Sequence, residues 1–343
     1  MMIIRSKAPF RLGLAGGGTD VSPYSDTYGG AILNATINLY AHATIIPRKD
    51  DQIILNAKNV NTSEKHDLKE FLPIDGVMDL QKGVYNRICK TYRIPSTGFE
   101  LITSSDVPSG SGLGTSSTLV VAILGAFVEW LKIPLGNYDI AQLAYDIERN
   151  DLKMAGGKQD QYAATFGGVN FMEFLANNKV VVNPLQLKKK WLHELELRMV
   201  LYYTQTSRES SKIINIQAEN AKQKKDRPIQ AMHELKSQAF EMKTALLRGK
   251  LNKIGDILNK SWHHKKAMAE GISNEEIDRL YHLAIDAGAT GGKMSGAGGG
   301  GFMIFFVPWD KQQVLIEKLN GEKGSCYRFE FCKKGLTTWT IKS

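Results

Sequence analysis

A glycine-rich stretch in the first half of the sequence most constrains the fold, because it joins an extended segment directly to an apolar helix. It lies between the extended run 99–103 and the apolar run 119–124 and reads Val107-Pro108-Ser109-Gly110-Ser111-Gly112-Leu113-Gly114-Thr115-Ser116-Ser117. Its alternating glycines permit backbone conformations that other residues disfavour, and the hydroxyls after them are typical of helix caps. Free backbone N–H groups at such a helix start bind phosphate. The Gly-Lys-Ser/Thr ending of a P-loop is missing, and a simple tight connection remains the alternative.

Composition indicates an ordinary globular protein that is long enough for two domains. The 343 residues are 43% hydrophobic and 23% charged, as in typical globular chains. The net charge of +9 is compatible with nucleic acid as a ligand. However, the densest basic groups, at 188–190 and 222–227, contain no interleaved aromatic residues on which bases could stack. We therefore expect an anionic small molecule as the ligand, and neither nucleic acid nor a membrane as a partner.

The cysteines and the apolar runs indicate the compartment. Cys89, Cys326 and Cys332 are odd in number and lack the spacing of a metal site. Residues 1–9 contain no apolar core of a signal peptide, and the longest apolar run, 119–128, is too short to span a bilayer. We expect a reduced, cytoplasmic protein.

Apolar periodicity predicts sheet and helix in both halves of the chain. Pro9 indicates an edge or a break in the first extended segment, 3–14. We expect a long strand at 32–47 with 52–57 as its hairpin partner, and a second strand pair at 169–175 and 179–184. Helices are expected at 82–92 and from the glycine-rich stretch to about residue 132.

The second half is predicted to form an antiparallel sheet backed by helices. Strands are expected at 197–204, 302–307, 326–331 and 336–341, and helices at 274–287 and over an apolar face made of Met232, Leu235, Ala239, Met242 and Leu246. The three lysines at 188–190 are interpreted as the connection between domains, so the expected domains are 1–188 and 189–343.

Three carboxylates lie where they could carry chemistry. Asp20 ends a glycine turn and could accept hydrogen bonds from sugar hydroxyls, although a helix-capping aspartate is the alternative. Glu148 is expected beside the buried stripe of a helix at 140–149, and Asp160 follows a Gly-Gly break at the start of another helix. These two could converge, one on a cation and the other on a proton. A surface glutamate and an N-capping aspartate remain the alternative for this pair.

Taken together, three glycine-rich loops and the 148–160 segment resemble the GHMP small-molecule kinases, a family that includes galactokinase, homoserine kinase and mevalonate kinase. Residues 108–117 are similar to the family's phosphate-binding motif, Pro-x-x-x-Gly-Leu-Gly-Ser-Ser, with Thr115 in place of the first serine. Residues 293–301 are similar to the family's third motif, and 157–161 to the segment that carries its catalytic aspartate.

The N-terminal glycine turn resembles one branch of the sugar kinases in this family. Gly17 and Gly18 stand where galactokinases have Glu-His before the Thr-Asp pair, which argues against galactose. Residues 11–20, 22–25 and 29–30 most resemble the D-glycero-D-manno-heptose 7-phosphate kinases, which phosphorylate an anomeric hydroxyl on the way to a nucleotide-activated heptose. The L-fucokinase branch is the alternative, although it has tryptophan in place of Gly18.

The resemblance implies an α+β fold, with a ribosomal-S5-like N-terminal α/β domain, a ferredoxin-like C-terminal domain and the active site between them. It implies ATP and Mg²⁺ as cofactors and a heptose 7-phosphate as acceptor, converted to the 1,7-bisphosphate. Asp160 and Arg11 would be catalytic, and Ser116 and Glu148 would hold the metal. The implied phosphate-binding residues are Pro108, Gly110, Ser111, Gly112, Leu113, Gly114, Thr115, Ser116 and Ser117. The implied substrate-binding residues are Gly17, Gly18, Thr19, Asp20, Arg208, Gly296, Ala297 and Gly298.

A protein that senses nucleotides or sugar phosphates without catalysis is the alternative from a different class. The presence of Arg11, Ser116, Glu148 and Asp160 together argues against it, because a sensor does not need that set.

Overall fold

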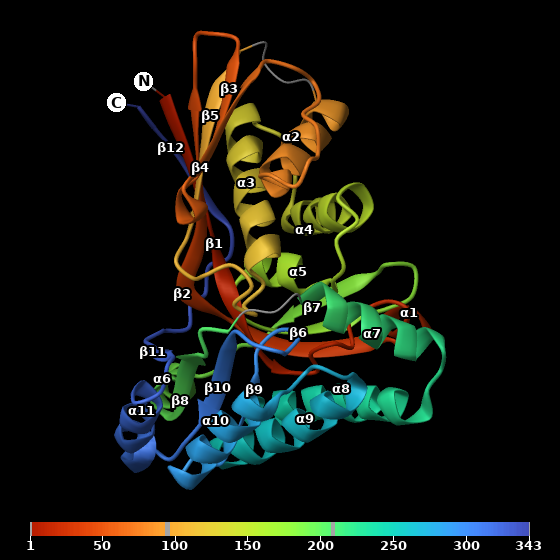
Figure 1. The fold of residues 1–343 in the computed structure, drawn as a ribbon, viewed down its shortest axis with the longest axis vertical. Coiled ribbons are helices and arrows are strands. Elements are labelled where there is room, and N and C mark those ends of the chain that lie inside the picture. Colours follow the sequence, from red (N-terminus) through yellow and green to blue (C-terminus); the bar gives the residue numbers. More distant parts are fainter. Residues whose placement is uncertain (1, 93–96, 207–209, 343) are drawn as a thin grey trace.

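The computed structural model describes residues 2–92, 97–206 and 210–342, which form two β-sheets with helices packed around them (Figure 1). The strands are β1 (Met2–Ala15), β2 (Gly30–Pro47), β3 (Gln52–Ala57), β4 (Thr62–Asp67), β5 (Phe99–Ser105), β6 (Val169–Phe174), β7 (Val180–Pro184), β8 (Met199–Tyr203), β9 (Gly291–Met294), β10 (Phe302–Phe306), β11 (Ser325–Tyr327) and β12 (Thr337–Lys342). The helices are α1 (Tyr24–Tyr28), α2 (Asp79–Thr91), α3 (Thr115–Leu131), α4 (Asn137–Asp146), α5 (Gln159–Phe166), α6 (Lys189–Arg198), α7 (Ser210–Lys222), α8 (Asp226–Leu247), α9 (Ile254–Met268), α10 (Glu275–Asp286) and α11 (Gln312–Asn320).

The first sheet is built on the two long strands β1 and β2. Its order is β12-β1-β2-β5-β3-β4, and β6 and β7 extend it from the start of β2. The apolar helix α3 packs on β1 and β2, and α2, α4 and α5 lie on the same side of the sheet as α3 (Figure 1). The expected break at Pro9 is wrong, because β1 runs unbroken through Pro9 from Met2 to Ala15, although its pairing with β2 shifts register between Pro9 and Arg11.

The predicted hairpin between 32–47 and 52–57 is wrong. β5 lies between β2 and β3, antiparallel to β2 and parallel to β3, and β3 instead forms a hairpin with β4. Phe99 and Leu101 of β5 are completely buried, whereas β4 alternates only between half-buried and exposed residues. The more apolar strand therefore occupies the centre of the sheet.

The last strand also lies in a different sheet from the one expected. Residues 337–342 pair antiparallel with 2–7 of β1, so both termini lie side by side (Figure 1). In the second sheet the position beside β8 is taken by β11. The expected strand 326–331 is shorter than predicted, because regular pairing ends at Tyr327 and Phe331 makes an isolated bridge to Ile37.

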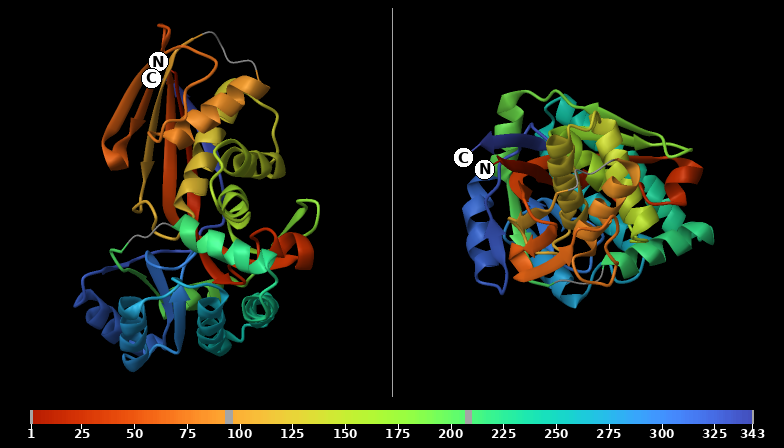
Figure 2. Two further views of the ribbon diagram at one scale, coloured as in Figure 1. Left: turned by 45° about the vertical axis from the view of Figure 1, so that its right-hand side comes forward. Right: turned by 90° about the horizontal axis from the view of Figure 1, so that it is seen from above.

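The second sheet is antiparallel, in the order β11-β8-β10-β9, and it lies with α8 to α11 at the end of the molecule away from the termini (Figure 2). β10 is buried on both faces. Phe302 and Ile304 face the core shared with the first sheet, while Met303 and Phe305 pack with α9 and α10. The predicted apolar face of α8 is confirmed as buried.

The expected connection between domains is partly helical, since Lys189 and Lys190 begin α6. We propose that residues 1–188 and 189–343 form the two domains, except that β12 returns to the first sheet. Within the described residues, none of the helices combines the length and apolar character needed to cross a membrane.

Candidate active site

A pocket of about 680 Å³ brings together the three glycine-rich loops. Its walls include Gly17 and Gly18 of the first loop, Gly110, Gly112 and Gly114 of the second, and Gly296 and Ala297 of the third. Asp20, Glu148 and Asp160 line the same pocket. Residues that lie far apart in the sequence therefore converge on one site.

The second loop leads into α3 through glycines with left-handed backbone. Gly110, Gly112 and Gly114 have φ values of 71°, 80° and 78°, which non-glycine residues rarely adopt. Gly114 takes the N-cap position itself, so the three hydroxyls predicted at the cap occupy the first turn of α3 instead. Thr115, Ser116 and Ser117 line the pocket from that turn.

The second loop is packed directly against the third loop and against α5. A Cβ on Gly112 would lie 2.6 Å from the carbonyl oxygen of Ser295, and one on Gly296 would lie 2.6 Å from the carbonyl oxygen of Gly112. A Cβ on Gly114 would lie 2.8 Å from the carboxyl carbon of Asp160. Only glycine permits these approaches, so the loop, its neighbour and Asp160 hold one another in place.

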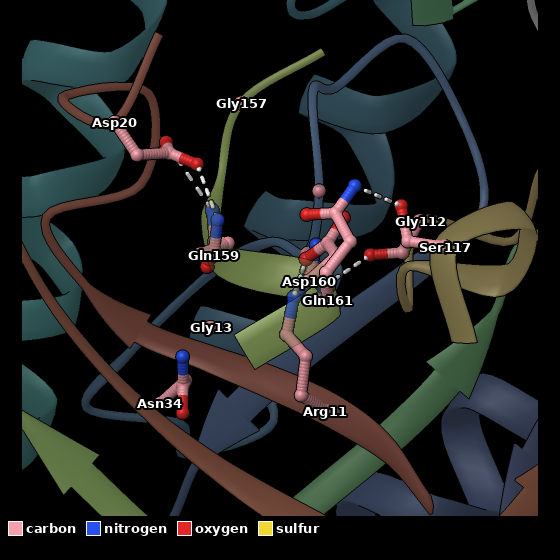
Figure 3. A network of polar contacts seen from close by, with 12 residues as sticks. Arg11, Gly13, Asp20, Asn34, Gly112, Ser117, Gly157, Gln159, Asp160 and Gln161 are labelled. Atoms are coloured by element: carbon pink, nitrogen blue, oxygen red, sulfur yellow. Dashed lines mark hydrogen bonds and ion pairs between the residues drawn. The ribbon is translucent and has the colours of Figure 1, made fainter. Parts of the chain in front are cut away.

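Arg11 connects Asp160 to the second loop (Figure 3). It projects from β1 beside the register shift between Pro9 and Arg11 in the pairing with β2. Its Nε donates to Oδ1 of Asp160 at 2.7 Å, and its Nη1 donates to the carbonyl oxygen of Gly112 at 2.7 Å. The Arg11 side chain is 4% exposed, so water screens this ion pair poorly.

Glu148 is buried at the site by a turn of π-helix, Ile147–Asp151. The side-chain amide of Gln161 donates to the Glu148 carboxylate and also to Oγ of Ser117, at 3.0 Å (Figure 3). The Arg149 guanidinium lies 3.9 Å from the carboxylate. Burial raises the pKa of Glu148, and the charge of Arg149 opposes that rise.

Asp20 binds the start of the helix that carries Asp160. Its Oδ2 accepts backbone N–H bonds from Lys158 at 2.9 Å and Gln159 at 3.0 Å (Figure 3). A Cβ on Gly157 would lie 2.0 Å from this same oxygen. The helix-capping alternative is thus part of the structure, although the helix is α5 rather than one that follows Asp20 directly. Burial raises the pKa of Asp20, and the hydrogen bond from Gln159 opposes that rise.

Some residues expected at the site serve the loops instead of lining the pocket. The Thr19 hydroxyl donates to the carbonyl oxygen of Gly16 in its own turn and to that of Ala31 in β2. Leu113 is completely buried, and so is Ser111, whose hydroxyl has no hydrogen-bond partner among the described residues. Pro108 and Gly298 also lie outside the lining of the pocket. Arg208 lies outside the residues that the structure describes.

Two residues at the site were missed by the sequence analysis. Gln161 was quoted only as part of a motif, and its bridge to Glu148 depends on a contact that no local pattern reveals. Lys265, from α9, lines the pocket although its side chain is almost entirely buried. It follows Leu258 and Trp262 at helical spacing, on the buried face of α9. A lysine at a position of this apolar stripe could have been recognised in the sequence as a buried cation.

Lys265 carries a positive charge into the pocket beside Arg11. Its Nζ donates to the carbonyl oxygen of Gly296 and lies 3.9 Å from the position of a Cβ on Gly17. Burial, together with the charge of Arg11, lowers the pKa of Lys265 to about 8, while Asp20 opposes the change. A second buried lysine, Lys293, donates to the carbonyl oxygen of Gly13 at 2.9 Å.

Comparison with known proteins identifies the family. Residues 79–168 match the GHMP kinases N terminal domain, and residues 242–325 match the GHMP kinases C terminal domain. The D-glycero-alpha-D-manno-heptose 7-phosphate kinase of Campylobacter jejuni is 51% identical over 341 residues, which are 99% of this chain and 100% of that protein. A crystal structure of a D-glycero-D-manno-heptose 1-phosphate kinase from Bacteroides thetaiotaomicron has a TM-score of 0.85 at 46% identity, and covers 99% of this chain and 100% of its own.

A more distant relative corresponds to the alternative branch. The L-fucokinase/L-fucose-1-P guanylyltransferase of Bacteroides fragilis is 26% identical over 364 residues, which are 98% of this chain but 38% of that longer protein. The expected resemblance to the heptose 7-phosphate kinase branch, and the expected fold with its N-terminal and C-terminal domains, are confirmed. With two matching domains and 51% identity over nearly its whole length, the chain belongs to the GHMP kinases.

Proposed function

We propose that this protein is a kinase that transfers the γ-phosphoryl group of ATP to the anomeric hydroxyl of D-glycero-D-manno-heptose 7-phosphate. The proposal combines the substrate named for the Campylobacter jejuni relative with the geometry of the pocket. The observation that carries it is the contact of Arg11 with both Asp160 and the glycine-rich loop. This contact holds the Asp160 carboxylate beside the glycine-rich loop. It supports the proposal, because phosphoryl transfer to a hydroxyl needs a group that orients the acceptor close to the donor phosphates.

The second loop fits the phosphates of ATP. Its left-handed glycines line the pocket without side chains in the way, and the first turn of α3 adds hydroxyls and the positive end of a helix dipole. We assign the donor phosphates to this segment, with Thr115, Ser116 and Ser117 as the hydroxyl contacts.

The chemistry of the donor set fits Mg²⁺, whose preferred ligands are oxygens. Glu148 is a buried carboxylate whose nearest cationic group, that of Arg149, stands 3.9 Å away, so a divalent cation would compensate its charge. We assign Glu148 and Ser116 as the protein ligands. When bound, the ion would neutralise charge on the phosphates.

We assign to Asp160 the role of binding the hydroxyl group of the acceptor. A carboxylate in hydrogen-bond reach of the hydroxyl can orient it and accept its proton. The ion pair with Arg11, at 2.7 Å, holds the Asp160 carboxylate in place, and the same guanidinium can stabilise negative charge on the group in transfer.

We assign the sugar to the first glycine turn. Asp20 presents a buried carboxylate to the pocket, and Gly17 and Gly18 leave its wall free of side chains. Ser210 and Ser211, at the start of α7, line the same pocket. They adjoin Arg208, which the sequence analysis proposes for the acceptor's own phosphate.

The test is ATP consumption with a panel of acceptors: D-glycero-D-manno-heptose 7-phosphate, the unphosphorylated heptose, L-fucose and galactose. We expect the heptose 7-phosphate to have the highest kcat/KM. Asp160→Asn should lower turnover on it by about 100-fold or more, the range of general acid–base contributions. Preference for L-fucose would move the assignment to the alternative branch. Binding of ATP without turnover on any acceptor would favour the sensor.

A further inference from the structure

Lys265 is a buried lysine that lines the pocket without a carboxylate partner among the described residues. Arg11 is paired with Asp160 at 2.7 Å, and Arg149 lies beside Glu148. Within the described ranges, the Lys265 ammonium has no ion pair, and the hydrogen bond given for it is the one to the Gly296 carbonyl oxygen. A buried ammonium without a counter-charge is costly, so a protein that retains one in its binding pocket gains when an anion binds there.

The surroundings of Lys265 place it on the acceptor side of the pocket. Its Nζ lies 3.9 Å from the position of a Cβ on Gly17 of the first glycine turn, and the charge of Asp20, which ends this turn, opposes the lowering of the pKa of Lys265. Met268, one turn further along α9, would be 2.6 Å from a Cβ on Gly18. This part of α9 therefore packs along the turn to which we assign the sugar.

We propose that the Lys265 ammonium binds the terminal phosphate of the acceptor sugar. This inference rests on the proposed function, because it supplies the acceptor's phosphate with a partner. Of the three donor hydrogens of an ammonium, one is used by Gly296, and the others are available to phosphate oxygens. The dianionic phosphate would also supply the missing counter-charge, so that Lys265 selects phosphorylated over unphosphorylated sugar.

The experiment compares Lys265→Met with wild type on heptose 7-phosphate and on the unphosphorylated heptose. Methionine retains much of the apolar stem and removes the charge. A charge-assisted hydrogen bond corresponds to about a 10- to 100-fold change in binding. We therefore expect KM for the heptose 7-phosphate to rise 10-fold or more, with KM for ATP and kcat/KM for the free heptose nearly unchanged.

The control is Lys260→Met, which removes an exposed lysine from the same helix and should leave all three constants at their wild-type values. An equal loss on phosphorylated and free heptose would overturn the inference, because Lys265 would then act on the ring or on the transferred group. An unchanged KM for the phosphorylated sugar would overturn it as well. Failure of the proposed function would look different, because wild-type enzyme would then show no preference for the heptose 7-phosphate.

Discussion

The burial of Lys265 predicts a stability effect that is independent of catalysis. The pKa of Lys265 is lowered from 10.5 to about 8, chiefly by burial, so the folded state disfavours the charged form. Since one pKa unit corresponds to about 1.4 kcal/mol, protonated Lys265 reduces the free energy of unfolding by about 3 kcal/mol at pH 7. Because the folded-state pKa is depressed, the stability linked to this group is fully present above pH 10.5 and is lost as pH falls through about 8.

Lys265→Met removes this ionisation, so the ligand-free variant should be more stable than wild type at pH 7. The difference should shrink by about 2 kcal/mol between pH 7 and pH 9.5, by integration of the linkage relation. Urea denaturation of both proteins at the two pH values measures it, and the other titrating groups cancel in the difference. If the difference in free energy of unfolding between the two proteins does not change with pH, the reasoning is refuted. A difference caused only by the packing of methionine would be independent of pH.

Three further substitutions test the loops and the carboxylates. Glu148→Gln should lower turnover by about 100-fold at ordinary Mg²⁺ concentrations, as expected for loss of a charged metal ligand, with an unchanged circular dichroism spectrum; near-normal turnover would rule out the metal assignment. Gly112→Ala forces a side chain into left-handed backbone and should raise KM for ATP while lowering the free energy of unfolding by about 1–3 kcal/mol. Gly13→Ala, where a Cβ meets nothing within 4 Å, is its control. Gly157→Ala should displace Asp20, whose oxygen would be 2.0 Å from the new Cβ, and should lower kcat/KM for the sugar about 10-fold or more; a wild-type value would contradict the role of this contact.

Local patterns predicted the elements of this fold better than their partners. The strand at 52–57 and the apolar run after 335 were recognised, yet both were assigned to the wrong neighbours. Periodicity reports how one strand is buried, and it carries no information on which strand lies beside it. Ile53 and Leu55 of β3 are as completely buried as Phe99 and Leu101 of β5, so the burial of a strand does not by itself decide which strand pairs with β2.

The candidate site also shows that local patterns predict a segment better than its contacts with distant residues. The glycine-rich loop and the helix after it form a continuous segment, so the sequence alone predicted a glycine-rich turn that leads into a helix. The binding of phosphate there stays a prediction. Arg11 and Asp160 pair across 149 residues, and both were singled out as catalytic only through resemblance to a family. Gln161 was not anticipated, because its amide joins Ser117 and Glu148 by contacts that exist only after folding.

The position of Asp20 links the sugar side of the pocket to the residue assigned to catalysis. Its carboxylate accepts the N–H groups of Lys158 and Gln159 at the start of α5, and Asp160 is the next residue of that helix. A carboxylate at a helix start is stabilised by the free N–H groups and the dipole there, so Asp20 helps to fix where the helix begins. The same carboxylate faces the pocket. A sugar hydroxyl bound to Asp20 would therefore have a fixed position relative to Asp160. The connection consists of the two backbone hydrogen bonds to Asp20 and the peptide unit between Gln159 and Asp160. That short connection offers a physical reason why the first glycine turn, although distant in the sequence, can set both which sugar binds and how its hydroxyl meets the carboxylate of Asp160.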